Sequence, residues 1–460
     1  MEQDTNNKIN LSMLLDLYEI SMSASYFQFK NNAKAVFDLF IRRMPANRSF
    51  FMAAGLEDIL DYLSNFSFDP ASIESLRNMG IFQESFLGYL SKLRFSGDVW
   101  ALREGEIFFP NEPVIRVIAP IIEAQLVESY LLNTVNLNTT IATKASRVTM
   151  AAKDRGVYDF SLRRTHGVDA SLKAARASYI AGCKGTSNVL AGMKYKIPVA
   201  GTMAHSFVMS FDNELDSFRA FVSTFPKHSI LLVDTYDNFS GVKNAIVVAK
   251  EMEKAGCKLN GIRLDSGDLA KLSKKVRIML DKAGLSYVKI FASGNLDEYK
   301  IAKLLKKRAP IDNFGVGTNM GVSEDAPYCD VIYKISEVTD ASGEFLPTMK
   351  LSIGKSTYPG RKQIYRILDN KGMFARDILA LESESIKGMP LLAKVMESGK
   401  SIYMAPLLDE VRRVAQDNLL RLPDKYKRLN KSYRYPVAIS QGLKIHTKKV
   451  LKSIKHRSRQ

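Results

Sequence analysis

The sequence predicts an α/β fold whose central part is a βα barrel. From about Phe225, short apolar runs alternate with amphipathic segments, and each apolar run is followed by polar residues or glycines. This alternation is typical of βα units with parallel strands. Six or more such units would close into a barrel, and the segment 146–338 has room for them. An open doubly wound sheet is the alternative.

The first third of the chain is predicted to mix helices and strands. Apolar residues at helical spacing predict helices over 12–29 and 55–66, and 121–153 is long enough for one or two helices. The β-branched, proline-interrupted stretch 106–120 predicts short strands joined by turns.

The alternating part is predicted to be a series of buried strands and amphipathic helices. Each strand is a short apolar run, and the first two helices end at a glycine, which is a common helix stop. The expected strands are 229–234, 260–265, 287–293, 312–319 and 329–336, and the expected helices are 241–256, 268–284 and 295–309. After Val338 the alternation stops, and two edge strands joined by a basic loop are expected over 346–352 and 361–368.

The composition excludes several classes of protein. No run approaches the roughly 20 apolar residues that a membrane span needs, and the polar start "MEQDTNNKIN" is unlike a signal peptide. The 3 cysteines have no metal-ligand spacing, which predicts reduced thiols in a cytoplasmic protein. The formal net charge is +18, and the tail from Lys444 contains basic residues but no acid. We interpret this tail as a solvated, partly helical surface rather than a nucleic-acid arm.

Polar or glycine clusters follow four successive predicted strands. Active sites of βα barrels assemble at the carboxyl ends of the strands, and four such clusters are hard to explain as turns alone. The last cluster, "FGVGTN", offers free backbone N–H groups at Gly315, Gly317 and Thr318 that could hold a phosphate. Alone it is a weak signal, because Gly-x-Gly also marks ordinary turns.

The cluster "RLDSGDL" combines an arginine with two acids. Asp268 or Ser266 is expected to cap the helix that begins near Leu269. The helix cap does not account for Asp265, which could accept hydrogen bonds from sugar hydroxyls or hold Mg²⁺ through water. Arg263 lies two residues earlier on the strand and therefore points to the same side as Asp265.

His205, in "GTMAHS", is one of only 5 histidines. A buried, hydrogen-bonded histidine and a catalytic one are equally good interpretations of these letters. Phosphorylation would require one exposed ring nitrogen and a carboxylate holding the other. Asp234, at the end of the strand 229–234, is the expected carboxylate.

These pieces together resemble the nicotinate phosphoribosyltransferase family. The matching stretches run in family order over nearly the whole chain, and only the basic tail lies outside them. They are "LLDLYEISM", "LRRTHGVDASLKAARASYIAGCKGTSNVLAGMKYKIPVAGTMAHSFVMSF", "LLVDTYDNFSGVKNA", "GIRLDSGDLA", "NFGVGTN", "MKLSIGKSTYPGRKQIYR" and "YPVAIS".

The resemblance implies a fold, an assembly and a reaction. The fold would be an irregular βα barrel of the type II phosphoribosyltransferase kind over 141–339, with an α/β sandwich built from 1–140 and 340–460. The assembly would be a homodimer with shared active sites. The reaction would convert nicotinate and 5-phosphoribosyl 1-diphosphate to nicotinate mononucleotide and pyrophosphate. ATP and Mg²⁺ would drive it through a phosphate carried on His205.

The resemblance also implies roles for individual residues, and no resident metal site. His205, Asp234 and Asp265 would be catalytic. The substrate-binding residues would be Asp16, Tyr18, Phe160, Arg163, Ser187, Arg263, Gly294, Gly315, Gly317 and Thr318, with Tyr18 supplied by the partner subunit. Phosphates of pyrophosphate or ATP would contact Arg43, Lys350, Lys355 and Arg361. The related nicotinamide enzymes carry an aspartate where this chain has Ser187, and serine tolerates the carboxylate of nicotinate.

Two positions depart from the family pattern. Leu15 replaces a usual threonine, and His166 replaces a usual glutamine in "RRxQG".

Two other functions are alternatives to this one. The competing enzyme would be a relative that uses nicotinamide or quinolinate. A nucleic-acid-binding protein that uses the basic tail ranks far lower, because it leaves the four strand-end clusters unexplained.

Overall fold

The computed structural model describes residues 10–352 and 357–457, which form two compact units. The first unit combines the residues up to Thr140 with those from Tyr328 onward, and the second is Ile141–Pro327. The sequence analysis places the second boundary at 339. In the structure β12 (Val331–Thr339) pairs antiparallel with β1 (Lys34–Ile41), so it lies in the first unit. Within the described ranges, no helix combines the length and hydropathy that a membrane span requires.

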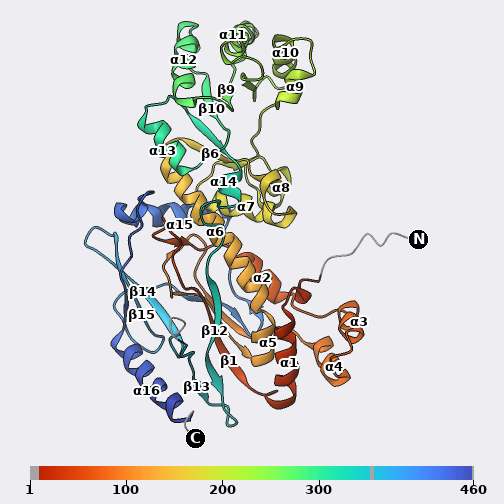
Figure 1. The fold of residues 1–460 in the computed structure, drawn as a ribbon, viewed down its shortest axis with the longest axis vertical. Coiled ribbons are helices and arrows are strands. Elements are labelled where there is room, and N and C mark those ends of the chain that lie inside the picture. The colour runs from red at the N-terminus through yellow and green to blue at the C-terminus, as the bar shows by residue number, and fades with distance from the viewer. Residues whose placement is uncertain (1–9, 353–356, 458–460) are drawn as a thin grey trace. The chain divides into compact units, whose positions relative to one another are not determined.

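A seven-stranded sheet organises the first unit, in the order β13-β12-β1-β5-β3-β17-β18 (Figure 1). β1 pairs antiparallel with β12 on one side and β5 on the other, and all its residues except Lys34 are buried. The remaining strands of this sheet are β3 (Asp98–Ala101), β5 (Pro113–Pro120), β13 (Phe345–Pro347), β17 (Ala393–Glu397) and β18 (Lys400–Ser401).

A second, four-stranded sheet in the same unit has the order β16-β14-β15-β19. Its strands are β14 (Lys362–Leu368), β15 (Phe374–Leu381), β16 (Met389–Pro390) and β19 (Val437–Ile439), and a separate ribbon joins β2 (Phe51–Met52) to β4 (Ile107–Phe108). The expectation that 361–368 is an edge strand is wrong, because β14 pairs with β15 on one side and β16 on the other.

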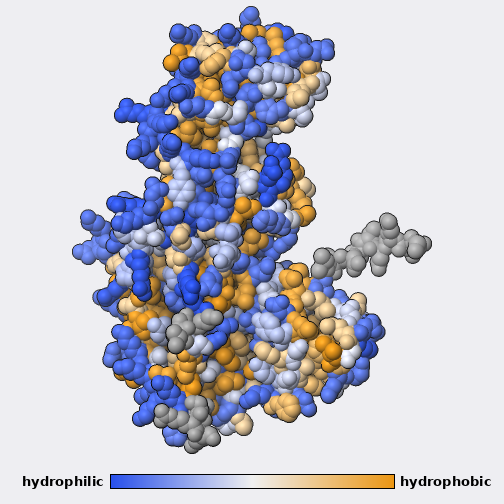
Figure 2. Space-filling view, in the orientation of Figure 1, coloured by the Kyte–Doolittle hydropathy of each residue, from blue (hydrophilic) through white to orange (hydrophobic). Residues whose placement is uncertain are grey.

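The helices of the first unit pack with their buried side chains toward its interior, and every residue of α5 is buried. They are α1 (Leu17–Phe29), α2 (Leu56–Ser64), α3 (Pro70–Asn78), α4 (Glu84–Lys92), α5 (Ile121–Leu126), α15 (Leu408–Arg421) and α16 (Gln441–Arg457), and the boundary at Thr140 falls inside α6 (Glu128–Ala152). Hydrophobic residues also reach the surface around α1, α3 and α4 (Figure 2). The basic tail is the outer face of α16: Leu443 and Val450 are buried, whereas Lys444, Lys448 and Lys452 are exposed.

Six parallel strands organise the second unit, in the order β7-β6-β11-β10-β9-β8 (Figure 1). From β8 to β11 each strand pairs with the next one along the chain, and β11 returns to pair with β6. This is the ring order of a barrel with one gap, between β7 and β8, where the described residues form no ladder. The strands are β6 (Gly156–Asp159), β7 (Gly185–Thr186), β8 (Ile230–Leu232), β9 (Gly261–Leu264), β10 (Lys289–Ala292) and β11 (Asn313–Val316). The irregular βα barrel is therefore confirmed over the open doubly wound sheet.

The three predicted helices are present as α11, α12 and α13, with ends within three residues of the predicted ranges. Asp237, Asp268 and Asp297 cap α11, α12 and α13 by accepting hydrogen bonds from backbone N–H groups. Gly256 and Gly284 follow α11 and α12 with φ of 75° and 73°, a conformation that glycine adopts without strain. The helices of this unit are α7 (Val168–Ile180), α8 (Val189–Tyr195), α9 (His205–Met209), α10 (Glu214–Thr224), α11 (Asn238–Lys254), α12 (Leu269–Lys282), α13 (Glu298–Lys306) and α14 (Thr318–Gly321).

Candidate active site

Hydrogen bonds between polar side chains join the carboxyl ends of three neighbouring ring strands. Asp234, after β8, accepts a hydrogen bond from the backbone N–H of Asp265 at 3.0 Å and from the Ser266 hydroxyl at 2.6 Å. Asp265, after β9, in turn accepts a hydrogen bond from the hydroxyl of Ser293, after β10. Three of the four predicted strand-end clusters are therefore connected by hydrogen bonds.

Two glycines at this edge permit close approaches that a side chain would block. Gly294 has φ +92°, and a Cβ there would lie 2.0 Å from the carbonyl oxygen of Asp265. At Gly315 a Cβ would lie 2.6 Å from two ring carbons of Phe160. Gly315 is therefore the surface on which the Phe160 ring rests.

Phe160 presents a fixed, partly exposed aromatic ring. It follows β6, and its backbone N–H donates to the carbonyl of Val316 at 2.9 Å. Its ring stacks on Phe291 with a centroid separation of 5.7 Å and an interplanar angle of 8°. Because one face is packed and the ring cannot tilt, the exposed part could stack on another planar group.

Asp159 is a buried carboxylate that the sequence analysis missed. It accepts hydrogen bonds from the backbone and hydroxyl of Ser161 at 3.0 and 2.6 Å, and from the Thr186 hydroxyl at 2.8 Å. Burial raises the pKa of Asp159. Its backbone carbonyl also accepts from the N–H of Ser187 at 2.8 Å, so it sets the position of that serine. The sequence signal was its place at a strand end, the feature used for Asp234.

A pocket of about 470 Å³ brings Arg163 and Ser187 together. Arg163 lies in a single 3₁₀ turn, Leu162–Arg164, and the pocket wall continues onto the starts of α7 and α8. Both side chains were predicted to lie at the carboxylate end of the substrate. The same wall includes Leu162, Val168, Val189 and Leu190, so the pocket combines one cation with apolar surface.

Arg263 is a second cation near this region, and both terminal nitrogens of its guanidinium have partners. Its guanidinium lies 3.6 Å from the Asp265 carboxylate and donates hydrogen bonds to the Thr202 hydroxyl and the Met203 carbonyl. Burial lowers the pKa of Arg263; Asp265 and Asp234 oppose that shift, and Arg163 adds to it. Arg263 and Asp265 were expected on the same side of the strand, and they form an ion pair there. The hydrogen bonds to Thr202 and Met203 also fix the loop that precedes His205.

His205 is the first residue of α9, and its ring is partly exposed. Nδ1 lies 3.2 Å from the hydroxyl oxygen of Thr235. The sequence analysis expected the carboxylate of Asp234 in this place. That carboxylate instead points to the end of the adjacent strand, where Asp265 and Ser266 donate to its Oδ2. Its Oδ1 is buried and has no hydrogen-bond partner among the described residues.

The phosphate nest lies at the end of β11. Gly315 is in the strand, Gly317 follows it, and Thr318 begins α14. A Cβ added to Gly317 would lie 3.1 Å from the carbonyl oxygen of Phe160. The structure thus places the three predicted phosphate-binding residues beside Phe160, at the same edge as Asp265.

Asp16 and Tyr18 lie in the first unit, at the start of α1. Asp16 precedes the helix, and Tyr18 is 48% exposed. Behind them Glu19 is fully buried and accepts a hydrogen bond from the Ser129 hydroxyl at 2.7 Å. Burial raises the pKa of Glu19 to about 7. Leu15, which replaces the family's threonine, packs against the hydrophobic core.

The predicted phosphate-binding cations of the first unit have different surroundings. Arg43 is exposed in a pocket of about 430 Å³ that Arg42 and Arg434 also line. Arg361 is already paired with Glu337 at 3.0 Å and lies over the ring of Phe345. Lys350 is exposed, and Lys355 lies outside the described residues.

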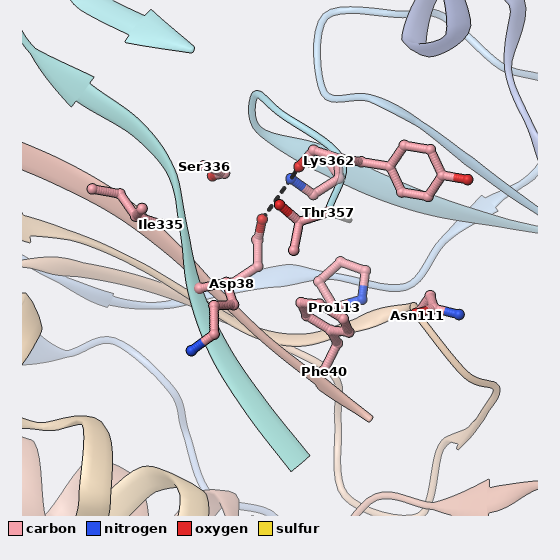
Figure 3. A pocket seen from close by; sticks show the side chains of 10 residues that line it. Asp38, Phe40, Asn111, Pro113, Ile335, Ser336, Thr357 and Lys362 are labelled. Atoms are coloured by element: carbon pink, nitrogen blue, oxygen red, sulfur yellow. Dashed lines mark hydrogen bonds and ion pairs between the residues drawn. The ribbon is translucent and has the colours of Figure 1, made fainter. Parts of the chain in front are cut away.

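Lys362, the first residue of β14, faces the interior. Figure 3 shows the Lys362 ammonium directed at the Asp38 carboxylate, which is 2.7 Å away. Lys362 also donates to the carbonyls of Tyr358 and Gly360, and burial lowers its pKa. The adjoining cavity of about 30 Å³ has room for a water molecule but not for a phosphate. Lys362 is a structural residue.

Comparisons with known proteins agree with this arrangement. Three family models match: the nicotinate phosphoribosyltransferase N-terminal domain over residues 13–136, the nicotinate phosphoribosyltransferase family over 156–343, and the C-terminal domain over 386–446. The chain is also 48% identical, over 434 residues, to a Mycobacterium tuberculosis protein named nicotinate phosphoribosyltransferase pncB2; the match covers 94% of this chain and 92% of that protein. The chain belongs to the nicotinate phosphoribosyltransferase family.

Other members of the family extend the likeness. A Bacillus subtilis nicotinate phosphoribosyltransferase is 39% identical, with 94% of this chain and 93% of that protein covered. The crystal structure of human nicotinic acid phosphoribosyltransferase superposes with a TM-score of 0.84 at 28% identity, covering 95% of this chain and 99% of that chain. A nicotinate-nucleotide pyrophosphorylase from Pyrococcus furiosus superposes with a TM-score of 0.72 at 26% identity, covering 92% and 98%.

Among residues 10–352 and 357–457, no group of three or more His, Cys, Asp or Glu side chains is arranged to hold a metal ion. The polar strand ends instead offer single carboxylates. Asp234 and Asp265 could bind a hydrated Mg²⁺ that arrives with a phosphate-bearing substrate, because Mg²⁺ commonly keeps several waters and one or two carboxylate ligands.

Proposed function

We propose that this chain transfers a 5-phosphoribosyl group from 5-phosphoribosyl 1-diphosphate to the ring nitrogen of nicotinate, which yields nicotinate mononucleotide and pyrophosphate. This reaction is the first step of NAD salvage from nicotinate. The observation that carries the proposal is the carboxyl edge of the parallel ring, where Phe160, Arg263, Asp265 and the Gly315–Thr318 nest lie together. Three free cysteines agree with a cytoplasmic location.

The chemistry demands positioning more than strong acids or bases. The pyridine nitrogen of nicotinate is already a nucleophile, and the ribose centre becomes cationic as pyrophosphate leaves. Phe160 would stack on the pyridine ring, and the N–H groups of Gly317 and Thr318 would hold the 5′-phosphate. Asp265 would accept hydrogen bonds from the ribose hydroxyls and stabilise the developing positive charge.

Two features support nicotinate over nicotinamide as the substrate. Arg163 and Arg263 are two cations close enough to interact with each other, and we expect both to face the carboxylate of nicotinate. Ser187 places no negative charge there. The decisive experiment measures mononucleotide formation from nicotinate and from nicotinamide in competition. Nicotinate should be used with a large preference in kcat/KM. Use of nicotinamide or quinolinate without nicotinate would contradict the proposal and favour the alternative relative.

We further propose that ATP with Mg²⁺ phosphorylates His205 and that hydrolysis of this phosphate drives product formation. The support is the position of His205: it is the first residue of α9, its Nδ1 lies 3.2 Å from the Thr235 hydroxyl oxygen, and the residue is partly exposed. Arg43, Lys350, Lys355 and Arg361 are the candidates for contacts with the pyrophosphate or ATP phosphates. Arg361 would have to exchange its Glu337 partner for a phosphate.

The active unit is proposed to be a homodimer with shared active sites. Tyr18 supports this, because its ring is 48% exposed at the start of α1 and is therefore free to contact another subunit. In the dimer, Tyr18 of the partner subunit would contact the second face of the pyridine ring, opposite Phe160.

A further inference from the structure

The ring of His205 has one hydrogen-bonding contact in the described part of the chain. Its Nδ1 lies 3.2 Å from the hydroxyl oxygen of Thr235, and its Nε2 has no partner among the described residues. The two ring nitrogens are therefore in different surroundings. One faces a hydroxyl group inside the barrel edge, and the other is open to a substrate.

The position of Thr235 is well defined. It lies two residues after Val233, which is fully buried and whose backbone N–H donates to the carbonyl of Arg263 at 3.2 Å. Threonine is branched at Cβ, so its hydroxyl has few available orientations. Asp234, between them, is turned to Asp265 and Ser266. The backbone thus presents the Thr235 hydroxyl to the imidazole ring and keeps the carboxylate away from it.

We propose that Thr235 is the positioning residue for His205: its hydroxyl oxygen accepts a hydrogen bond from Nδ1–H and so keeps Nε2 unprotonated for attack on the triphosphate. This inference rests on the phosphohistidine proposed above. A ring nitrogen can attack phosphorus only with a free lone pair, and a neutral imidazole has one such nitrogen. Fixing the proton on Nδ1 selects Nε2.

The phosphoryl step balances with these groups alone. The lone pair of Nε2 attacks the terminal phosphorus of ATP, and the Nε2–P bond forms. The bond from that phosphorus to the bridging oxygen breaks, and ADP leaves with the electron pair. The ring then carries one positive charge, and its Nδ1–H still donates to Thr235. Water later attacks the phosphorus and returns the lone pair to Nε2.

A neutral hydroxyl suits this cycle better than the carboxylate expected from the sequence. A carboxylate beside Nδ1 would stabilise the positively charged ring, and so would strengthen the Nε2–P bond in the phosphorylated enzyme. Thr235 fixes the tautomer without supplying an anion. The phosphorylated ring therefore remains a good leaving group, as an intermediate that must be hydrolysed in every cycle requires.

The test compares Thr235→Val, which removes the hydroxyl with little change of shape, with Thr235→Ser, which retains it. Thr224→Val is the matched control, because Thr224 is exposed on α10 and its hydroxyl contacts only its own helix. With γ-labelled ATP, Thr235→Val should phosphorylate His205 about tenfold more slowly, the effect of losing one hydrogen bond. Thr235→Ser and Thr224→Val should stay near the wild-type rate. Equal rates on the same ring nitrogen in Thr235→Val would overturn the proposal.

A second readout separates this inference from the phosphohistidine itself. Nitrogen NMR of ring-labelled enzyme without ATP reports which nitrogen carries the proton. Wild type and Thr235→Ser should have the proton on Nδ1, whereas Thr235→Val should shift toward the Nε2–H form that free imidazole favours. If wild type takes no label on His205, the ATP step is wrong, and the tautomer still decides the role of Thr235. An Nε2–H ring in wild type would overturn it.

Discussion

At the residue scale, the candidate site depends on side chains that hold other groups as much as on those that would touch substrate. Glycine at 315 makes room for the Phe160 ring, and Arg263 holds the loop before His205. The sequence indicated Gly315 and Arg263 through the strand-end clusters, and the family resemblance implied the roles of Phe160 and His205. It could not show that Thr235, and not Asp234, meets the imidazole, because that depends on which way two adjacent side chains turn.

Gly315→Ala should displace the Phe160 ring, because a Cβ at residue 315 would lie 2.6 Å from that ring and 3.1 Å from Phe291. We expect the KM for nicotinate to rise about tenfold or more, since a small misplacement of a stacking group is costly. Overpacking should also lower the free energy of unfolding by about 1–3 kcal/mol. Gly88→Ala, where nothing lies within 4 Å of the added Cβ, is the control. An unchanged KM would refute the role given to Phe160.

His166→Gln should keep activity. His166 is exposed in the turn before α7, so restoring the glutamine that the family usually carries removes no buried contact. Steady-state kinetics with nicotinate would check this. A collapse of turnover would show that the histidine takes part in the site.

At the element scale, the order of strands and helices follows from patterns that are local in sequence. The apolar runs 229–234, 260–265, 287–293 and 312–319 became ring strands, whereas 329–336 became β12 of the seven-stranded sheet. Aspartates at three helix starts became caps. The return of β11 to β6 and the gap between β7 and β8 depend on contacts between distant residues, which one sequence does not show. β14 was misplaced at an edge for the same reason, since its second partner, β16, lies more than 20 residues away along the chain.

Asp297→Ala should destabilise the second unit by about 1 kcal/mol, because the Asp297 carboxylate caps α13 by accepting from the Lys300 N–H at 2.7 Å. Asp297→Ser should restore most of the loss. Urea unfolding of the two variants measures the difference. Equal stability of Asp297→Ala and wild type would mean that water replaces the cap without cost.

Glu19 should make the first unit less stable as the pH rises. Its folded pKa of about 7 lies above the ordinary 4.5, so the folded state binds the proton more tightly. The stabilisation is complete below about pH 4.5 and is lost as the pH rises through about 7. Glu19→Gln should remove this dependence while Ser129 can still donate to the amide oxygen. Urea unfolding across this pH range tests it, and identical profiles for the two proteins would contradict it.

At the scale of the whole molecule, the chain consists of two units that contribute different parts of the predicted chemistry. Phe160, His205 and Asp265 belong to the second unit, and Tyr18 and Arg43 belong to the first. The sequence analysis assigned the same residues to the same units, because the first boundary lies at 140 in both descriptions. Whether subunits share these groups depends on assembly, which sequence patterns do not encode.

Mixing two inactive variants should restore activity if the sites are shared. Tyr18→Ala and His205→Ala would each damage every site in their own homodimers. If Tyr18 acts in the partner's site, a mixed dimer has one site with both changes and one intact site. Random mixing should then recover about a quarter of wild-type activity. No recovery after verified subunit exchange would contradict the shared site.

The central claim is that this enzyme passes a phosphate through His205 while it makes nicotinate mononucleotide. The most direct measurement incubates the enzyme with γ-labelled ATP, with and without nicotinate and 5-phosphoribosyl 1-diphosphate. The account predicts acid-labile, base-stable label on wild type, faster loss of that label when both substrates are present, and no label on His205→Ala. Label retained by His205→Ala at the wild-type level would contradict it.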